Sequence, residues 1–183
     1  MRLFTAVTLG ATIEARTTAE LARLREVAPH ARFVKAEGVH LTLVFLGEVE
    51  EARLPPILAA LEAVGPRHAP FMLSVGGGGS FGSPARPRVL WADVRGETDA
   101  LQALQADTSA VLEPLGFKPE HREYTAHLTL ARAKDPRGDP ALVRCVQALK
   151  GSDLGEGRVD RLVLFESKGG RYLSRLEVPL TRA

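Results

Sequence analysis

Two kinds of hydrophobic spacing alternate along the chain, and together they predict an α+β fold. Apolar residues at every second position, or in short runs, predict strands at 2–9, 31–35, 39–46, 70–75, 89–94, 124–131, 159–165 and 172–180. Apolar residues three and four positions apart predict helices at 18–27, 51–64, 97–115 and 141–149. Short strands mixed with helices and joined by tight turns favour α+β over a doubly wound parallel sheet.

Local residue chemistry sets the expected boundaries of these elements. Thr17 or Thr18 is expected to cap the first helix, because a hydroxyl can accept from the free N–H groups of the first turn. The run from Gly76 to Gly79 lacks the Lys-Ser/Thr ending and helix start of a phosphate-binding P-loop, so we interpret it as a bulged or mobile strand end. Turns or loops are predicted at Glu37-Gly38, Asp135 to Pro140 and Lys168 to Gly170.

One four-residue stretch, His-Leu-Thr-Leu, occurs twice in predicted strands, starting at His40 and at His127. The two histidines are 127 − 40 = 87 positions apart, close to half of the 183 residues. Side chains two apart on a strand share a face, so each histidine projects together with its threonine, Thr42 or Thr129. We therefore predict a single domain over 1–183 made of two pseudo-symmetric lobes. Their antiparallel-rich sheets flank a central groove, with helices outside and the two His-Thr pairs facing each other.

Composition limits the classes of protein that the chain can belong to. Hydrophobic residues make up 45% and charged residues 25% of the chain, which is typical of globular proteins. No apolar run approaches the roughly 20 residues of a membrane span, so we expect no membrane partner. A single cysteine, Cys145, allows no intrachain disulfide, which suits the cytoplasm, and we interpret it as helix packing. The net charge of +2 restricts any polyanion binding to a local site.

The repeated His-Thr pairs point to acid–base chemistry on a phosphate. Two histidines alone do not supply the three or four ligands of a zinc site, and no dinucleotide-binding glycine pattern is present, so we expect no metal and no cofactor. A histidine with a pKa near 6.5 can donate or accept a proton at neutral pH. Two threonine hydroxyls can donate hydrogen bonds to phosphate oxygens. Arg132 adds a cation, but its odd spacing from His127 requires a strand end, bulge or twist to reach the groove.

Several separated stretches resemble the 2H phosphoesterase family, and within it the RNA 2′,3′-cyclic phosphodiesterase branch, also called 2′-5′ RNA ligase. They are Arg2 to Ala6, His40 to Leu43 with Phe45-Leu46-Gly47, Val89-Leu90-Trp91, and His127 to Arg132. The chain departs from the family at Ala126, where the family usually has proline.

The resemblance implies metal-independent hydrolysis of an RNA 2′,3′-cyclic phosphate to a 2′-phosphate, with reversible 2′-5′ ligation as the same chemistry run with a 5′-hydroxyl. It implies His40 as proton donor and His127 as proton acceptor, and it implies that Thr42, Thr129 and Arg132 hold the phosphate. The expected partner is RNA with a 2′,3′-cyclic phosphate end, and we expect a monomer. Two alternatives stay open: a non-catalytic RNA-end or nucleotide-binding module, and a phosphodiesterase for 2′-5′ oligonucleotides or ADP-ribose cyclic phosphate.

Further aromatic and histidine residues are assigned from their surroundings in the sequence. Candidates for stacking on a terminal base are Phe81, Phe117, Trp91 and Tyr124. We place Tyr124 in the groove and assign Trp91, which is in the middle of a predicted strand, to the core. The histidines in loop-like contexts are expected at the surface; these are His30, His68 and His121.

Overall fold

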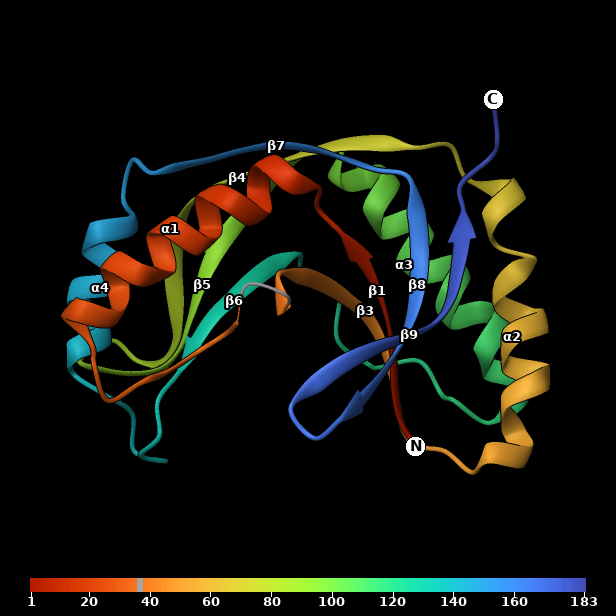
Figure 1. The fold of residues 1–183 in the computed structure, drawn as a ribbon, viewed down its shortest axis with the longest axis horizontal. Coiled ribbons are helices and arrows are strands. Elements are labelled where there is room, and N and C mark those ends of the chain that lie inside the picture. Colours follow the sequence, from red (N-terminus) through yellow and green to blue (C-terminus); the bar gives the residue numbers. More distant parts are fainter. Residues whose placement is uncertain (36–37) are drawn as a thin grey trace.

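The computed structural model describes residues 1–35 and 38–183, and it contains two antiparallel sheets (Figure 1). The first sheet has the strand order β3-β1-β8-β9 and the second has the order β2-β6-β5-β4-β7. The strands are β1 (Arg2–Thr8), β2 (Arg32–Phe33), β3 (His40–Glu48), β4 (Phe71–Ser83), β5 (Arg86–Gly96), β6 (His127–Arg132), β7 (Asp153–Val159), β8 (Arg161–Lys168) and β9 (Arg171–Pro179). The predicted α+β class is confirmed. Of the turn predicted at Glu37-Gly38, Glu37 lies outside the described residues.

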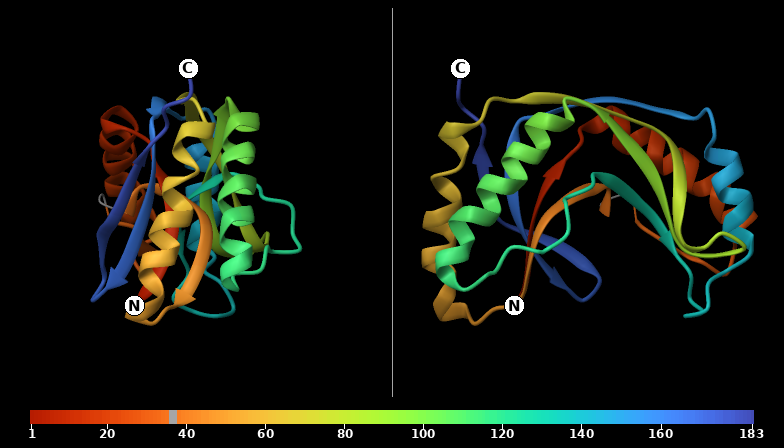
Figure 2. Two further views of the ribbon diagram at one scale, coloured as in Figure 1. Left: turned by 90° about the vertical axis from the view of Figure 1, so that its right-hand side faces the viewer. Right: turned by 180° about the vertical axis from the view of Figure 1, so that it is seen from behind.

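Helices cover the two sheets in pairs. The helices are α1 (Ala11–Val27), α2 (Leu54–Glu62), α3 (Thr98–Leu112) and α4 (Ala141–Leu149), with short 3-10 turns at Glu51–Arg53, Gly65–Arg67 and Glu113–Leu115. The helices α1 and α4 contact each other and the second sheet, whereas α2 and α3 contact each other and the first sheet. Figure 1 shows one pair toward each end of the long axis, and the right-hand view in Figure 2 shows the same arrangement from behind. No helix in the described ranges is long and apolar enough to cross a membrane.

The two halves of the sequence are interlaced rather than packed as separate lobes. The helices α2 and α4 are both nine residues long and start 141 − 54 = 87 positions apart, the same offset as the two histidines. The first sheet takes β1 and β3 from the first half and β8 and β9 from the second half. Its order β3-β1-β8-β9 corresponds to β6-β5-β4-β7 in the second sheet. Each lobe therefore depends on both halves of the chain.

The first helix begins earlier than its sequence pattern predicts. It starts at Ala11 after Gly10, whose φ of +87° favours glycine, and no side chain caps it. The predicted cap at Thr17 or Thr18 is wrong. Thr17 is fully buried on the same stripe as Ile13, so a polar residue occupies a core position and interrupts the apolar pattern. Thr18 instead donates a hydrogen bond to the Glu14 carbonyl at 2.7 Å, a contact within the helix.

The glycine run lies in the middle of β4 and does not end it, so the prediction of a strand end is wrong. The pairing of β4 with β5 shifts register between Val75 and Gly78, which confirms the predicted bulge. A Cβ atom at Gly79 would lie 2.6 Å from two ring carbons of Trp91 on the neighbouring strand. Glycine here leaves room for the indole to lie across the strand. The sequence pattern does not predict the glycine-rich strand β7, because glycine weakens the strand signal.

Candidate active site

The two His-Leu-Thr-Leu stretches form the first four residues of β3 and of β6. His40 and Thr42 are half-buried while Leu41 and Leu43 are buried in the core. The second copy repeats this alternation at residues 127–130. The predicted division of each strand into a polar and an apolar face is therefore confirmed. We call the face of each sheet that carries its His-Thr pair the site face.

A β-bulge follows each His-Thr pair and reverses which face of the sheet the next side chains occupy. In the pairing of β5 with β6, Trp91 lies opposite Thr129 and Leu90 opposite Ala131, so Leu130 is the extra residue. After this bulge the alternation resumes in the opposite phase, with Ala131 buried and Arg132 exposed. Arg132 therefore lies on the site face with His127. The bulge that the sequence argument required for Arg132 is present.

The same bulge occurs in β3, at a residue 130 − 43 = 87 positions earlier. Ala6 pairs with Thr42 and Thr5 with Val44, which leaves Leu43 as the extra residue. The buried Thr5 hydroxyl accepts a hydrogen bond from the Val44 N–H at 3.1 Å and holds the bulge in place. The position equivalent to Arg132 is then Phe45, whose side chain is 67% exposed. The two halves therefore carry a phenyl ring and a guanidinium at matching positions.

His40 is enclosed by aromatic rings. The Phe4 ring stacks on the imidazole at 5.1 Å between centroids, Tyr172 meets it edge-on at 5.2 Å, and Phe165 lies at 5.8 Å. Burial among these rings lowers the pKa of His40 to about 4, because the charged form loses its hydration, and the Gly38 carbonyl offsets part of this shift. The buried nitrogen is Nδ1, which leaves Nε2 as the nitrogen that a bound molecule can reach.

Fewer aromatic rings surround His127 than His40, and the charged side chain of Arg132 lies near it. Phe81 lies edge-on at 4.9 Å and Trp91 lies at 5.8 Å from the imidazole. Burial lowers the pKa of His127, the Thr125 carbonyl partly opposes that shift, and the positive charge of Arg132 lowers the pKa further. As in His40, Nδ1 is the buried nitrogen and the opposing carbonyl lies two residues earlier in the chain.

Tyr124 joins the segment before β6 to β3. Its hydroxyl donates a hydrogen bond to the Thr42 carbonyl at 3.0 Å, and burial raises the pKa of Tyr124 to about 12. Helix α3 supports the same region, because the Gln105 side-chain amide donates to the Leu43 carbonyl at 3.4 Å. The strands β3 and β6 also contact each other. The structure thus brings the two motif strands together, and Tyr124 connects them.

The structure corrects two of the sequence assignments. Trp91, which the sequence assigns to the core, is half-buried on the site face, beside His127. His68 is expected at the surface, but its side chain is only 14% exposed and its Nε2 lies 2.7 Å from a carboxylate oxygen of Asp107. His30 and His121 are exposed as expected, and Cys145 is buried. The ring of Phe117, a candidate for base stacking, lies 4.8 Å from the Arg53 guanidinium.

The sequence did not predict the three rings around His40 as part of the site. Phe4 had a signal, since it stands 91 − 4 = 87 positions before Trp91, the offset of the histidines. Phe165 and Tyr172 lie in the C-terminal hairpin, which the sequence predicts but does not assign to a sheet. Their position follows from the pairing of β8 with β1, in which Phe165 lies opposite Phe4. Only the sheet topology could have placed them beside His40.

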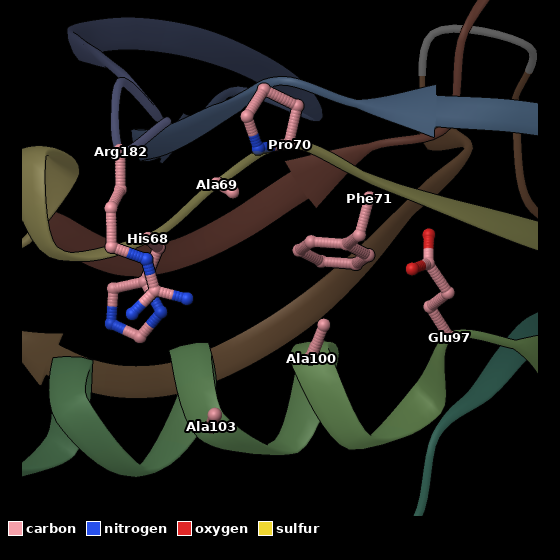
Figure 3. A pocket seen from close by; sticks show the side chains of 8 residues that line it. All are labelled: His68, Ala69, Pro70, Phe71, Glu97, Ala100, Ala103 and Arg182. Carbon is pink, nitrogen blue, oxygen red and sulfur yellow. The ribbon is translucent and has the colours of Figure 1, made fainter.

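Two pockets lie apart from the histidine pair. The first, of about 250 Å³, lies between α3 and the segment that contains His68 and Phe71 (Figure 3). The second, of about 230 Å³, lies beside the loop after β6 and is lined by His30, Arg86 and Lys134 among others. Neither contains a residue of the two His-Thr pairs.

A family model and curated relatives match most of the chain. The model described as LigT like phosphoesterase matches twice, at residues 12–91 and 93–172, one match for each half. The RNA 2′,3′-cyclic phosphodiesterase of Aeropyrum pernix is 35% identical over 151 residues, which cover 80% of this chain and 85% of the relative.

Solved structures match over nearly the whole chain. The protein TT0787 of Thermus thermophilus is 30% identical with a TM-score of 0.75, and the match covers 98% of both chains. LigT of Escherichia coli, solved with 3′-AMP bound, is 26% identical with a TM-score of 0.72, over 99% of this chain and 98% of that one.

Proposed function

The chain belongs to the LigT-like phosphoesterase family, and on this premise we propose that it hydrolyses RNA 2′,3′-cyclic phosphate ends to 2′-phosphates. The observation that carries the proposal is the pair of His-Thr strands, β3 and β6, which contact each other in two pseudo-symmetric sheets. Because hydrolysis at phosphorus needs a base on the entering oxygen and an acid on the leaving oxygen, two histidines from opposite sides suit the reaction.

The two histidines are proposed to divide the acid and base roles. Burial lowers the pKa of both His40 and His127, and the charge of Arg132 adds to the shift of His127, so the pKa values do not by themselves assign the roles. Following the family resemblance, we propose His127 as the base and His40 as the acid that protonates the leaving 3′ oxygen. Thr42, Thr129 and Arg132 would hold the phosphate oxygens. A 5′-hydroxyl in place of water would give a 2′-5′ linkage by the same proton transfers.

His40 needs the substrate to act as an acid. Its pKa of about 4 means that it is neutral at pH 7 when no ligand is bound. A phosphate anion beside the ring favours the imidazolium, and the attraction is strong where aromatic side chains exclude water. Substrate binding would then favour protonation of His40, and His40 would later donate this proton to the leaving oxygen.

The test is hydrolysis of a short RNA with a 2′,3′-cyclic phosphate end, measured in EDTA with the 2′- and 3′-phosphate products resolved. We expect wild-type protein to form the 2′-phosphate, and both His40→Ala and His127→Ala to lose at least about a hundredfold in rate, since each proton transfer is worth about 10²–10⁴. His121→Ala is the matched control, because that histidine is exposed and outside the site.

Other outcomes would identify the alternatives. A folded wild-type protein that binds the RNA but does not turn it over would be an RNA-end binding module. Faster turnover of a 2′-5′ oligonucleotide or an ADP-ribose cyclic phosphate would change the substrate but keep the site. Loss of activity in EDTA that a divalent ion restores would contradict metal-independent chemistry. A cytoplasmic location and a monomeric state stay predictions.

A further inference from the structure

Arg32 and Arg132 lie directly opposite each other on neighbouring antiparallel strands, β2 and β6. Directly opposed residues in an antiparallel pair project from the same face, with Cβ atoms about 4.5–5.5 Å apart. The next pair in the register is Phe33 with the buried Ala131. Phe33 packs on the core side, where the Arg25 guanidinium of α1 covers its ring at 5.8 Å. Arg32 therefore projects with Arg132 onto the site face.

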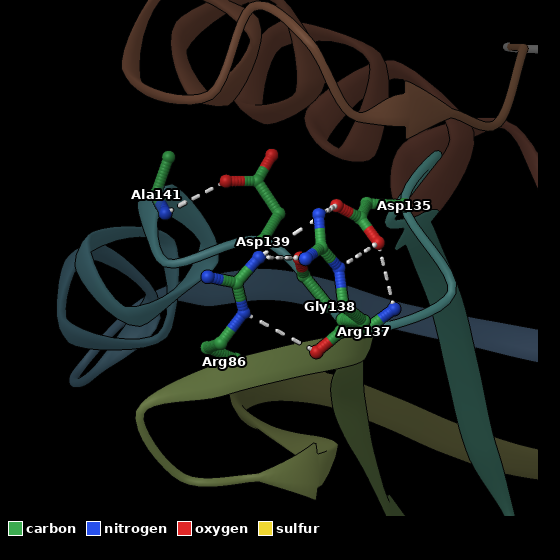
Figure 4. A network of polar contacts seen from close by, with 6 residues as sticks. All are labelled: Arg86, Asp135, Arg137, Gly138, Asp139 and Ala141. Atoms are coloured by element: carbon green, nitrogen blue, oxygen red, sulfur yellow. Dashed lines mark hydrogen bonds and ion pairs between the residues drawn. The ribbon is translucent and has the colours of Figure 1, made fainter.

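Two like charges directly opposite on a sheet destabilise it unless an anion lies between them. Both arginines are exposed, and within the described ranges neither side chain makes an ion pair or a hydrogen bond. Two arginines at this end of the sheet, Arg86 and Arg137, are instead neutralised, because both contact the carboxylate of Asp135 (Figure 4). Residues 1–35 and 38–183 supply no anion to the directly opposed Arg32 and Arg132, so this pair can take an anion from a bound molecule.

We propose that Arg32 binds the phosphodiester that precedes the terminal nucleotide of the RNA substrate, next to the cyclic phosphate held at Arg132. The inference rests on the proposed function and names the substrate class more closely: a chain of at least two nucleotides rather than a nucleoside 2′,3′-cyclic phosphate. The order along the site face supports it, since Thr129, Arg132 and then Arg32 lead away from His127 toward the edge strand β2. A guanidinium suits this ligand because its planar N–H groups match two phosphate oxygens.

The experiment compares three substrates: a dinucleotide with a 2′,3′-cyclic phosphate end, the same dinucleotide with a neutral methylphosphonate linkage, and a nucleoside 2′,3′-cyclic phosphate. The readout is the ratio of kcat/KM for the dinucleotide to kcat/KM for the nucleoside compound. We expect Arg32→Ala to lower this ratio by about tenfold or more, as loss of a charged hydrogen bond predicts. We also expect the methylphosphonate to lower the wild-type ratio equally and to add little to the effect of Arg32→Ala.

Two further readouts separate binding from general charge or stability effects. The slope of log kcat/KM against log salt for the dinucleotide should become shallower by about 0.7 in Arg32→Ala, the value for one lost phosphate contact on a single strand. Arg144→Ala is the matched control, because it removes an arginine from α4, outside the site face. The free energy of unfolding of Arg32→Ala should not fall, since the substitution relieves repulsion between two like charges.

The outcomes distinguish this inference from the proposed function. If the wild-type protein turns over the substrates and Arg32→Ala leaves the ratio within about twofold of wild type, as an exposed side chain without a ligand predicts, the inference is wrong. Equal losses on the dinucleotide and the nucleoside compound would also overturn it, because Arg32 would then act on the cyclic phosphate itself. If the wild-type protein turns over none of the three substrates, the proposed function fails first.

Discussion

The aromatic enclosure of His40 predicts that the free energy of unfolding depends on pH in a way that one substitution removes. His40 has a pKa of about 4 in the folded protein, whereas an unfolded histidine titrates near 6.5. Between these values the unfolded chain binds a proton that the folded protein does not. Stability is therefore fully present above about pH 6.5 and falls as the pH drops toward 4.

The magnitude follows from the two pKa values. At pH 5 the unfolded histidine is almost fully protonated while His40 in the fold is mostly neutral, so the linkage costs about 2 kcal/mol relative to pH 7.5. The full separation of the two pKa values corresponds to about 3 kcal/mol, which is reached only below pH 4. Either cost is a large fraction of the roughly 5–15 kcal/mol by which folded domains are typically stable.

The assay is urea unfolding of wild-type protein and His40→Gln at pH 7.5 and pH 5. Carboxylates and the other histidines titrate in both proteins, so the difference between the two pH dependences isolates His40. We expect wild type to lose about 2 kcal/mol more than the variant on going from pH 7.5 to pH 5. Equal losses in the two proteins would refute the reasoning, because His40 would then be as easily charged in the fold as in water.

Three further substitutions test other contacts of the site. Tyr124→Phe leaves the Thr42 carbonyl without its hydrogen bond, so urea unfolding should show a loss of about 1–3 kcal/mol; an unchanged midpoint would mean that water replaces the hydroxyl. Gly79→Ala places a methyl group against the Trp91 ring and should destabilise the fold by about 1–3 kcal/mol. Trp91 is the sole tryptophan, so its emission spectrum should shift as well, and identical spectra would contradict the close contact. Phe45→Ala removes an exposed ring from the site face and should raise KM for an RNA end by the equivalent of about 1–3 kcal/mol if the ring stacks on a base; unchanged KM would exclude stacking.

The pH dependence of activity also differs from what two ordinary histidines would give. Reference pKa values place both limbs of a bell-shaped profile near neutrality. In the structure, burial lowers the pKa of both His40 and His127. The profile of kcat/KM reports the free protein, so its optimum should lie below pH 6.5. The profile of kcat should lie at higher pH, because the bound phosphate favours both imidazolium forms.

The sequence predicts the parts of the site that depend on a repeated local pattern. A repeat of four residues is enough to place each histidine and threonine on one face of a strand, because side-chain alternation depends only on the strand itself. Helix α4 begins and ends where its apolar spacing predicts, at Ala141 and Leu149. The hairpin of β8 and β9 is predicted for the same reason, since both strands alternate and glycines separate them.

The rest of the site depends on contacts between distant segments, which leave no local pattern. Leu130 continues the alternation of β6 in the sequence, and only its pairing with β5 makes it the extra residue of a bulge. Phe165 reaches His40 because β8 pairs with β1, where its partner Phe4 stands 165 − 4 = 161 positions earlier in the chain. The sequence suggests a strand end at Gly79 because glycine alone does not reveal which ring lies against it.

The two halves repeat the same bulge, but they carry different side chains two positions after its extra residue. A symmetric pair of histidines has no preferred base. Two positions after the extra residue one half carries the uncharged Phe45, and the other carries Arg132, whose charge adds to the effect of burial in lowering the pKa of His127. Arg132 also lies opposite Arg32 on the edge strand β2, which adds a second positive charge on the side of His127. An RNA chain bound with its terminal phosphate between the histidines would therefore extend its negative backbone past His127 toward these two arginines, and a reversed binding mode would place that backbone over the uncharged Phe45.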